Sequence, residues 1–579
     1  MSIILPVCAW RCRRSRRGCR RSPSWRGLRA SCWSIRSPGP QRRSHIADHI
    51  DSWVQTPELS CPTRGVVEEK RLGLAHLCPC QSSGMPFVAT SSVGIRLYPL
   101  LQCSAWAITA AQAPVPRGLD RDEPMRVGLF YESIRLPADE ALGLLGKTLL
   151  FRARPHTLVG PFVLSAVSGR RGGFFVFGAE GRLGYEGRRL GYSAGLGVGG
   201  GGGVAAPVGD GLVWRPSVNI TVPLSGWRMG ATLSAVHFPS GAISSGQLGV
   251  SLERAELFRF TTPSRVGESI VVSERSGLGI DALSIGSSRM TFVTEVNLAR
   301  TMTLVGVRAT RTLGTPRALR WSGGIETYGA AGGDAAGYME VLTVAGVEWP
   351  RAGRFSLGAS GALGAGGGGA VPMGSGALAR ATVHATVELS PLLAVRAELG
   401  RQYALGSLLR GRSQTLAAGI PLAPQFGDTV RLLRIEWSPL LTHLVRGTRT
   451  GGQTASLQTL GLAIARYVSP RRYLVAQAHS AVGGAAGAYA VGLLGAGISS
   501  REYGRVMAGI AMLTGAAGGG GVATGGGAVV QWEGWAAIRM TEAVAARVVT
   551  GATRSVSGAF ATPFVAIGGT SAMAMPGAR

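Results

Sequence analysis

The feature that most constrains this chain is a period-two alternation of apolar and polar residues. The segment RATVHATVELS (380–390) carries Val383, Ala385, Val387 and Leu389 on one face, opposite Arg380, Thr382, His384, Thr386 and Glu388. The segments PSVNITVPL (216–224) and WRMGATLSAV (227–236) follow the same rule. Because successive side chains of a strand point to opposite faces, the pattern predicts β-strands. Short turns such as YEGRRLG and SPRRY predict that neighbouring strands are antiparallel.

A glycine run recurs three times, at 197–211, 364–376 and 515–527. The similarity extends upstream, where 142–175, 304–338 and 460–489 align through a proline and a later aromatic residue. We therefore predict three degenerate copies of one unit, 127–302, 303–458 and 459–579. At about seven strands per copy, the chain is all-β, an antiparallel meander of about 20–24 strands.

The glycine runs do not have the pattern of a nucleotide-binding loop. None is followed by Gly-Lys-Ser/Thr, and at Gly146-Lys147-Thr148 the first glycine of that motif is replaced by Ala141. A free linker would not recur inside a patterned repeat. The alternation of Leu190, Tyr192 and Ala194 with Gly191 and Ser193 predicts a strand, and its glycine end predicts a bulge, a bend or a close backbone approach.

The amino-terminal region has a different composition. All eight cysteines lie before residue 104, and residues 1–84 lack any strand or helix period, so we predict a disordered or spurious upstream segment. Residues 85–113 resemble a secretory signal peptide, with an apolar stretch at 97–110 and an Ala-Gln-Ala cleavage pattern at 111–113. Residues 114–126 would then form the mature amino-terminal segment. A cysteine-free body fits a secreted chain that needs no disulfides.

Two architectures share the alternating pattern. A soluble β-sandwich buries its apolar face, whereas a transmembrane barrel directs that face to lipid and its polar face to a water-filled lumen. Three features favour a transmembrane barrel. The first two are the signal peptide and the segment length of about 9–11 residues. The third is the position of aromatic residues near strand ends, as in an interfacial girdle: Trp214, Phe238, Tyr403 and Trp437. The uncharged stretch 482–498 is interpreted as two strands with a turn. One large barrel and several tandem barrels both remain open.

On these segments the chain, from about residue 125 to its end, resembles Gram-negative outer-membrane β-barrel proteins in general. The resemblance implies a location in the cell outer membrane, with outer-membrane lipid and lipopolysaccharide as partners. One departure is that the last aromatic residue is Phe564, whereas such barrels usually end in one.

No catalytic constellation is evident. The histidines of the body, His156, His237, His384, His443 and His479, stand singly on different predicted strands. The acidic residues Glu132, Asp139 and Glu140 predict a turn, with calcium or substrate binding as the alternative. Asp210 is replaced by Ser375 and Gly526 in the other two copies, so it is not a repeated ligand. We therefore expect no enzyme activity, and no catalytic, cofactor-binding or metal site. The net charge of +29 comes almost wholly from arginine, which indicates codon bias, so nucleic acid is not expected as a partner.

Two functions are compatible with these features. The first is an outer-membrane barrel with a pore, channel or structural and anchoring role. The alternative is a secreted, surface-associated, glycine-rich β-repeat protein without a membrane span.

Overall fold

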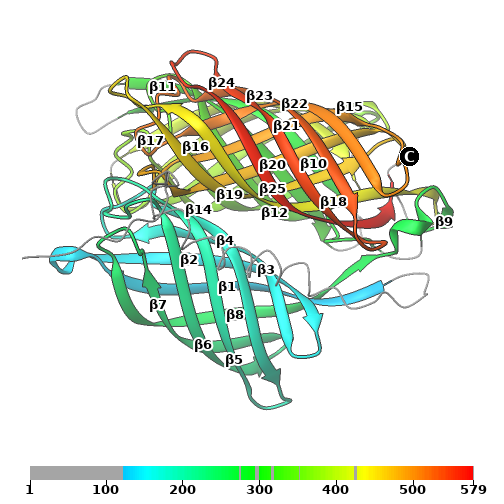
Figure 1. Ribbon diagram of the computed structural model, residues 1–579, viewed down its shortest axis with the longest axis horizontal. Coiled ribbons are helices and arrows are strands. Elements are labelled where there is room, and N and C mark those ends of the chain that lie inside the picture. Colours follow the sequence, from blue (N-terminus) through cyan, green and yellow to red (C-terminus); the bar gives the residue numbers. More distant parts are fainter. Residues whose placement is uncertain are drawn as a thin grey trace, which may run out of the picture. The chain divides into compact units, whose positions relative to one another are not determined.

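The computed structural model describes residues 121–577, except 273–274, 294–298, 314–318, 351, 408 and 423–426. These residues form three eight-stranded antiparallel β-barrels in tandem (Figure 1). The first barrel comprises β1 (Arg121–Arg135), β2 (Ala141–Arg154), β3 (Thr157–Ser168), β4 (Phe175–Glu186), β5 (Gly191–Gly202), β6 (Leu212–Leu224), β7 (Trp227–His237) and β8 (Ser244–Phe260). The predicted upstream segment 1–84 and signal peptide 85–113 lie outside the described residues.

The second and third barrels follow the same order. The second comprises β10 (Ala282–Val293), β11 (Ala299–Leu313), β12 (Arg320–Gly332), β13 (Met339–Glu348), β14 (Phe355–Gly367), β15 (Ala377–Ser390), β16 (Leu393–Ala404) and β17 (Arg410–Pro421). The third comprises β18 (Thr429–Thr448), β19 (Thr454–Tyr467), β20 (Arg472–Gly483), β21 (Ala490–Ser499), β22 (Val506–Gly518), β23 (Ala528–Arg539), β24 (Val544–Ser555) and β25 (Ala561–Pro576).

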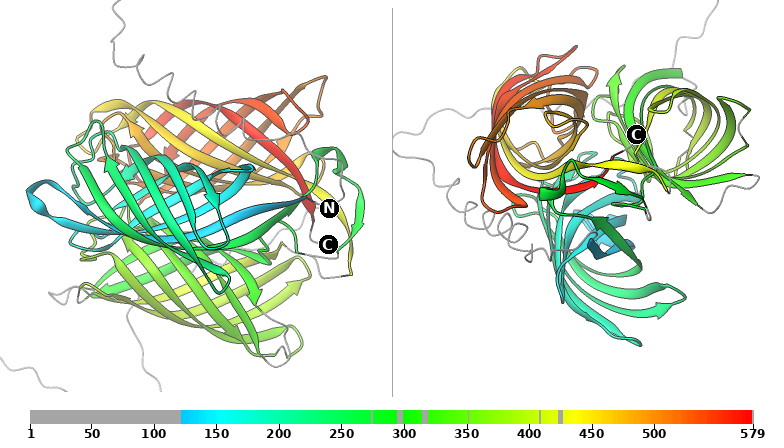
Figure 2. Two further views of the ribbon diagram at one scale, coloured as in Figure 1. Left: turned by 90° about the horizontal axis from the view of Figure 1, so that it is seen from below. Right: turned by 90° about the vertical axis from the view of Figure 1, so that its right-hand side faces the viewer.

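Each barrel is a meander whose first and last strands pair and close the sheet. The closing pairs are β1 with β8, β10 with β17, and β18 with β25, all antiparallel (Figure 2). Closure satisfies the backbone groups that an open sheet would leave unpaired at its edges. The connection between the first two barrels contains two short elements, η2 (Pro263–Arg265) and β9 (Ser269–Val271), and β9 pairs with the start of β18. A third short element, η1 (Pro137–Asp139), lies between β1 and β2.

The all-β fold, the antiparallel meander and the strand number expected from the sequence are confirmed, and the barrels are tandem rather than one large barrel. The glycine-run copies occupy the same place in each barrel, at the end of the fifth strand: β5, β14 and β22. The predicted unit boundaries after residues 302 and 458 fall inside β11 and β19, because the recognisable similarity begins at the second strand of each barrel. The stretch 482–498 forms the end of β20, a turn and β21, as predicted.

The two faces of each sheet have opposite character. Large apolar side chains point outward and are exposed: Leu183, Leu196, Leu233 and Leu248 on the first barrel, Leu363, Val383, Leu399 and Leu416 on the second, and Ile510, Met512, Trp532 and Val548 on the third. Charged and polar side chains point inward, and many of them are buried. This distribution is the reverse of that in a water-soluble domain, where large exposed apolar surfaces are rare.

One part of each barrel interior is apolar. In the first barrel Phe174 and Phe238 are fully buried, with ring centroids 6.2 Å apart, beside Leu142 and Leu164. In the third barrel Tyr489 and Phe560 lie 6.1 Å apart in the corresponding cluster. Phe238 was expected in an interfacial girdle; its burial inside the barrel shows that expectation to be wrong for this residue.

Trp437 also differs from the girdle expectation. It packs in mid-strand against Phe151 and Phe258 of the first barrel, with ring centroids 5.2 and 5.9 Å away. An aromatic side chain on an outward face can pack against a neighbouring barrel, and strand position alone does not reveal this. Trp214 is half-buried, and Tyr403, near the end of β16, is 39% exposed, so these two retain access to the barrel surface.

The barrels contact one another through one repeated arrangement, which we call the glycine seam. In each case the third strand of one barrel contacts the fifth strand of the next: β3 with β14, β12 with β22, and β20 with β5. The third contact returns to the first barrel, so the head-to-tail contacts close into a ring, as in a cyclic trimer of separate subunits.

Backbone atoms meet directly at the glycine seam. The amide nitrogen of Gly172 donates to the carbonyl oxygen of Gly374, 2.8 Å away. A β-carbon at Gly337 would lie 2.7 Å from the amide nitrogen of Gly519, and one at Gly487 would lie 2.6 Å from the carbonyl oxygen of Gly209. These separations leave no room for a side chain. Of the three roles considered for the glycine runs, the structure therefore supports a close backbone approach, made between barrels.

Candidate functional site

The interior of the first barrel is occupied by two arginines and three glutamates. The guanidinium of Arg215 donates to both carboxylate oxygens of Glu132 at 2.8–3.2 Å, and Arg215 also lies 4.2 Å from the centre of the Phe130 ring. Arg182 pairs with Glu180 at 2.9 Å and with Glu253. All five charged side chains are at most 7% exposed. Charges buried this deeply require partners, because unpaired charges are very costly to remove from water.

The second barrel contains a larger network of the same kind. Arg308 lies between Glu326 and Glu398, with N–O distances of 2.7 Å to each. Arg380 pairs with Glu340 and lies 3.6 Å from Glu326. The network ends in polar side chains: Gln402 and Tyr338 donate to Glu340 at 2.9 and 3.1 Å.

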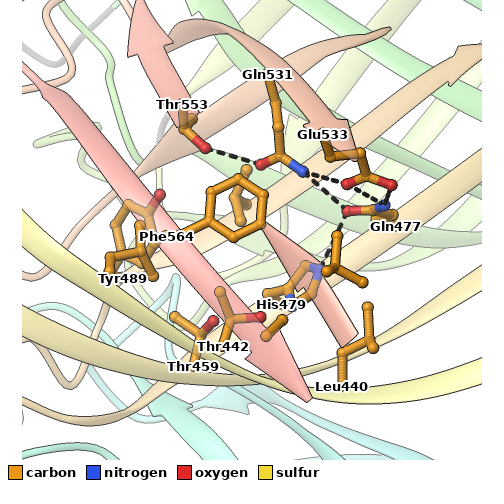
Figure 3. A pocket seen from close by; sticks show the side chains of 14 residues that line it. Leu440, Thr442, Thr459, Gln477, His479, Tyr489, Gln531, Glu533, Thr553 and Phe564 are labelled. Atoms are coloured by element: carbon orange, nitrogen blue, oxygen red, sulfur yellow. Dashed lines mark hydrogen bonds between the residues drawn. The ribbon is translucent and has the colours of Figure 1, made fainter. Parts of the chain in front are cut away.

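The third barrel has a different interior. Arg434 and Arg547 both pair with Glu436, at 2.6 and 3.4 Å. Glu533 is held by amides instead: Gln477 donates to its two oxygens at 3.0 Å, and Gln531 donates at 2.9 Å (Figure 3). Thr553 in turn donates to Gln531 at 2.8 Å.

The polar faces were expected to line a water-filled lumen, and the described residues show otherwise. An eight-stranded barrel has an interior just wide enough for its side chains to fill. Thr382, expected to face water, is 8% exposed and shares a 2.6 Å hydrogen bond with Ser360. The cavity in the third barrel measures about 20 Å³, space for a water molecule and not for a solute.

The single histidines do not converge with one another. His384 lies in the second barrel, where Arg396 is 2.9 Å from its Nδ1 and Glu348 is 3.7 Å away. His479 lies in the third barrel, with its Nε2 3.4 Å from Gln477. No group of three or more metal-ligating side chains occurs in the described part of the chain.

The acidic residues near the start of the body separate. Glu132 lies within β1 and pairs with Arg215, whereas Glu140 lies in the turn before β2 and pairs with Arg171 at 2.7 Å. The hydrogen bond from Arg171 lowers the pKa of Glu140 below its ordinary value. The predicted turn therefore contains Glu140 and Asp139, but Glu132 is a residue of the barrel interior.

Two other residues considered for binding lie between barrels. Lys147 lies in mid-strand on β2, and its ammonium donates to the hydroxyl of Thr343 in the second barrel at 2.9 Å. The carboxylate of Asp210 accepts from the amide of Ala485 in the third barrel at 2.5 Å. Lys147 is therefore a strand residue and does not stand at the end of a phosphate-binding loop. Asp210 belongs to the glycine seam.

The inward arginines were not identified from the sequence, although a signal for them exists. Each glycine run ends in a Gly-x-Gly turn, and the residue four positions after its last glycine is Arg215, Arg380 or Gln531. Each of these side chains points into its own barrel. An arginine recurring on the polar face of a strand at a fixed distance from the repeat landmark predicts a buried ion pair.

Among the residues that the structure describes, no helix is long and apolar enough to cross a membrane. Neither a family model nor a curated protein matches the chain. Solved structures do match. The FrpB iron transporter of Neisseria meningitidis is 8% identical, with 79% of this chain and 82% of that chain covered and a TM-score of 0.26. The Pseudomonas aeruginosa siderophore receptor PirA is 8% identical, with 77% of this chain and 80% of that chain covered and a TM-score of 0.25. OccK2 of the same organism, in complex with glucuronate, is also 8% identical, with 78% of this chain and 98% of that chain covered and a TM-score of 0.21.

These neighbours are Gram-negative outer-membrane β-barrels, the group that the strand pattern resembles. At such low identities and TM-scores the likeness carries no argument about this chain.

Proposed function

We propose that this protein resides in the outer membrane of a Gram-negative bacterium as three lipid-embedded barrels, with a structural or anchoring role and no catalytic activity. The observation that carries the proposal is the reversed polarity of the sheets. Val383 and Leu399 are 59% and 61% exposed on the outer face, whereas Glu340 and Arg380 are buried inside. Such surfaces are stable where hydrocarbon surrounds the barrel. Closed barrels also leave no unpaired backbone at membrane depth.

The filled interiors favour a structural role over a solute pore. Each interior contains an apolar cluster and a layer of buried polar side chains, and conduction would require these buried groups to separate. Breaking a buried ion pair costs about 3–5 kcal/mol. The alternative of a secreted, water-soluble repeat protein would leave the outward leucines and valines in water.

Arginines on the hairpins at the other end of the barrels from the glycine seam support a lipid partner. The β4–β5 hairpin exposes Arg188 and Arg189, and the corresponding β21–β22 hairpin exposes Arg501 and Arg505. Basic side chains at a membrane surface attract anionic headgroups. We propose that these hairpins contact the phosphates of lipopolysaccharide or anionic phospholipid.

Reconstitution of the full chain tests both parts of the proposal. The protein should stay in the membrane fraction after alkaline and urea washes, and it should give no stepwise conductance in a planar bilayer where a porin control conducts. Stable conductance would refute the sealed-barrel role. A chain that stays monodisperse in buffer without detergent would refute the membrane location.

A further inference from the structure

A hollow opens at the end of the first barrel where the glycine seam lies. Three turns of this barrel surround it, at 136–140 between β1 and β2, at 169–174 between β3 and β4, and at 203–211 between β5 and β6. Its volume is about 620 Å³, and it is lined by Glu140, Ala141, Gly169, Arg170, Arg171 and Val204. Pockets for small organic ligands measure about 300–1,000 Å³, so a molecule of the size of a sugar fits here.

One of the two arginines links the turns to one another. Arg171 donates to both carboxylate oxygens of Glu140 at 2.7–3.2 Å and to the carbonyl oxygen of Val204 at 2.8 Å. The third barrel has a link of the same kind, because Arg449 donates to the carbonyl oxygen of Gly520 at 3.0 Å and to a carbonyl oxygen of the turn between β20 and β21. A single arginine therefore holds these turns together, and the role of Arg171 is structural.

The second arginine, Arg170, takes no part in that link. Its side chain is exposed, and it forms no hydrogen bond or ion pair with another side chain in the described part of the chain. The hydrogen bond from Arg171 lowers the pKa of Glu140, and the charge of Arg170 lowers it further, so Glu140 is ionised at neutral pH. The lining therefore carries two positive charges and one negative charge. The other two barrels have Asp334 and Ala485 in the place of Arg170.

Val204 adds an apolar wall at a conformational cost. Its φ is 46°, in the left-handed region that is unfavourable for β-branched residues. The other two copies of this turn have glycine at the same position, Gly369 and Gly520, which accepts such a φ without strain. The Val204 side chain is 42% exposed and lines the hollow. A strained residue at a position where glycine would serve is typical of a ligand-binding loop.

We propose that this hollow binds a sugar acid, a polyhydroxylated molecule of monosaccharide size with one carboxylate. The carboxylate pairs with the guanidinium of Arg170, a geometry that is frequently bidentate, and its single charge balances the net charge of +1 on the lining. Hydroxyl groups donate to Glu140, whose oxygens have more lone pairs than Arg171 occupies. A phosphate monoester, with a charge of about −1.5 to −2 at neutral pH, would exceed the charge of the lining.

This proposal does not depend on the outer-membrane role, and calorimetric titration of the full chain in detergent micelles tests it with three probes. Galacturonate should bind saturably, with one site per chain. Galactose has the same ring without the carboxylate and should bind at least about 10-fold more weakly, because the charged hydrogen bonds to Arg170 are lost. Acetate has the carboxylate without the ring and should also bind more weakly. No saturable binding of galacturonate, or equal affinity for galactose or acetate, would overturn the proposal.

A pair of charge-matched variants locates the binding site. Arg170→Ala should weaken the binding of galacturonate about 10-fold or more, since it removes the partner of the carboxylate. Arg554→Ala removes an exposed arginine from the third barrel and should leave the affinity unchanged. Equal losses in the two variants would assign the binding to the positive charge of the whole protein and would overturn the proposal.

Val204→Gly separates binding from folding. Glycine accepts the backbone conformation of this turn, so the variant should be at least as stable to urea as the parent. Its affinity for galacturonate should nevertheless fall, by about fourfold for each methyl group that the ligand buries. Unchanged affinity in a variant of unchanged or higher stability would contradict a ligand packed against Val204.

Discussion

The backbone amide of Gly172 in the first barrel donates a 2.8 Å hydrogen bond to the carbonyl oxygen of Gly374 in the second. A β-carbon at Gly172 would lie 2.5 Å from the amide nitrogen of Gly376, so the two backbones meet without intervening side chains. The same fifth-strand glycine run is contacted in this way in all three barrels, which makes the glycine runs the contact surfaces of a ring within one chain.

Gly172→Ala should weaken this contact. The added methyl group would overlap backbone atoms of the second barrel, and overpacking of this kind costs about 1–3 kcal/mol. Urea unfolding in micelles should show the loss, and hydrogen exchange should accelerate across 366–376. Gly181→Ala is the control, because a β-carbon there meets no atom within 4 Å. Equal effects of the two substitutions would contradict the seam.

Cysteine labelling distinguishes the two faces of β15. The described body has no cysteine, so single cysteines can be introduced. In reconstituted protein, Val383→Cys should react with a lipid-soluble maleimide and resist a water-soluble one, because the side chain is 59% exposed on the outer face. Thr382→Cys should resist both reagents, because its side chain is 8% exposed inside the filled barrel. Rapid labelling at Thr382 by the water-soluble reagent would indicate an aqueous lumen instead.

The substitution Val383→Arg tests the same face through the free energy of unfolding. Placed at mid-membrane on the lipid face, it should cost about 2–4 kcal/mol of unfolding free energy. The measurement is equilibrium unfolding from lipid vesicles. Arg188→Lys, on an exposed hairpin, serves as the control and should change little. A cost near zero at Val383 would place this side chain in water.

Arg215→Met should destabilise the first barrel strongly. Among the described residues, the hydroxyl of Ser234, at 2.6 Å, would then be the remaining hydrogen-bond partner of the buried Glu132 carboxylate. Removal of one member of a buried pair costs about 3–5 kcal/mol. Adding Glu132→Gln should recover part of the loss, since the uncompensated charge is then gone. Chemical denaturation of the three proteins checks this order, and a double variant no more stable than Arg215→Met would contradict it.

The pair of Glu140 and Arg171 should make the β1–β2 turn sensitive to acid. The hydrogen bond from Arg171 holds the pKa of Glu140 below its ordinary value of 4.5. Because the pKa of Glu140 is lowered in the folded state, its contribution to the stability of the fold is present above the ordinary pKa. That contribution is lost as the pH falls through the lowered pKa. The carboxyl carbon shift of Glu140, followed by NMR, should titrate at higher pH in Arg171→Ala than in the parent. Arg188→Ala, on a hairpin of the opposite end, should leave it unchanged.

The alternation along 380–390 was sufficient to predict β15 and its two faces, because the two-residue period of a strand is a local property of the backbone. The same holds for 482–498, where turn residues between two apolar runs predicted β20 and β21. What each face contacts is not local. The expectation of water around Thr382 was wrong because eight strands leave an interior that their own side chains fill.

For the buried ion pairs, too, one part can be derived from the sequence and another part depends on the tertiary structure. Arg215, Arg380 and Gln531 stand at one fixed distance from a repeated turn, so their equivalence can be derived from the sequence alone. Which glutamate each arginine meets depends on strands far away in the chain, such as β1 for Arg215. Likewise, the chain's own pattern determined strands, turns and a threefold repeat. Only the tertiary structure decided that β1 closes on β8 rather than continuing into one large barrel, and that the glycine runs meet the next barrel. Closure and seam both rest on long-range backbone contacts, and these have no period in the sequence.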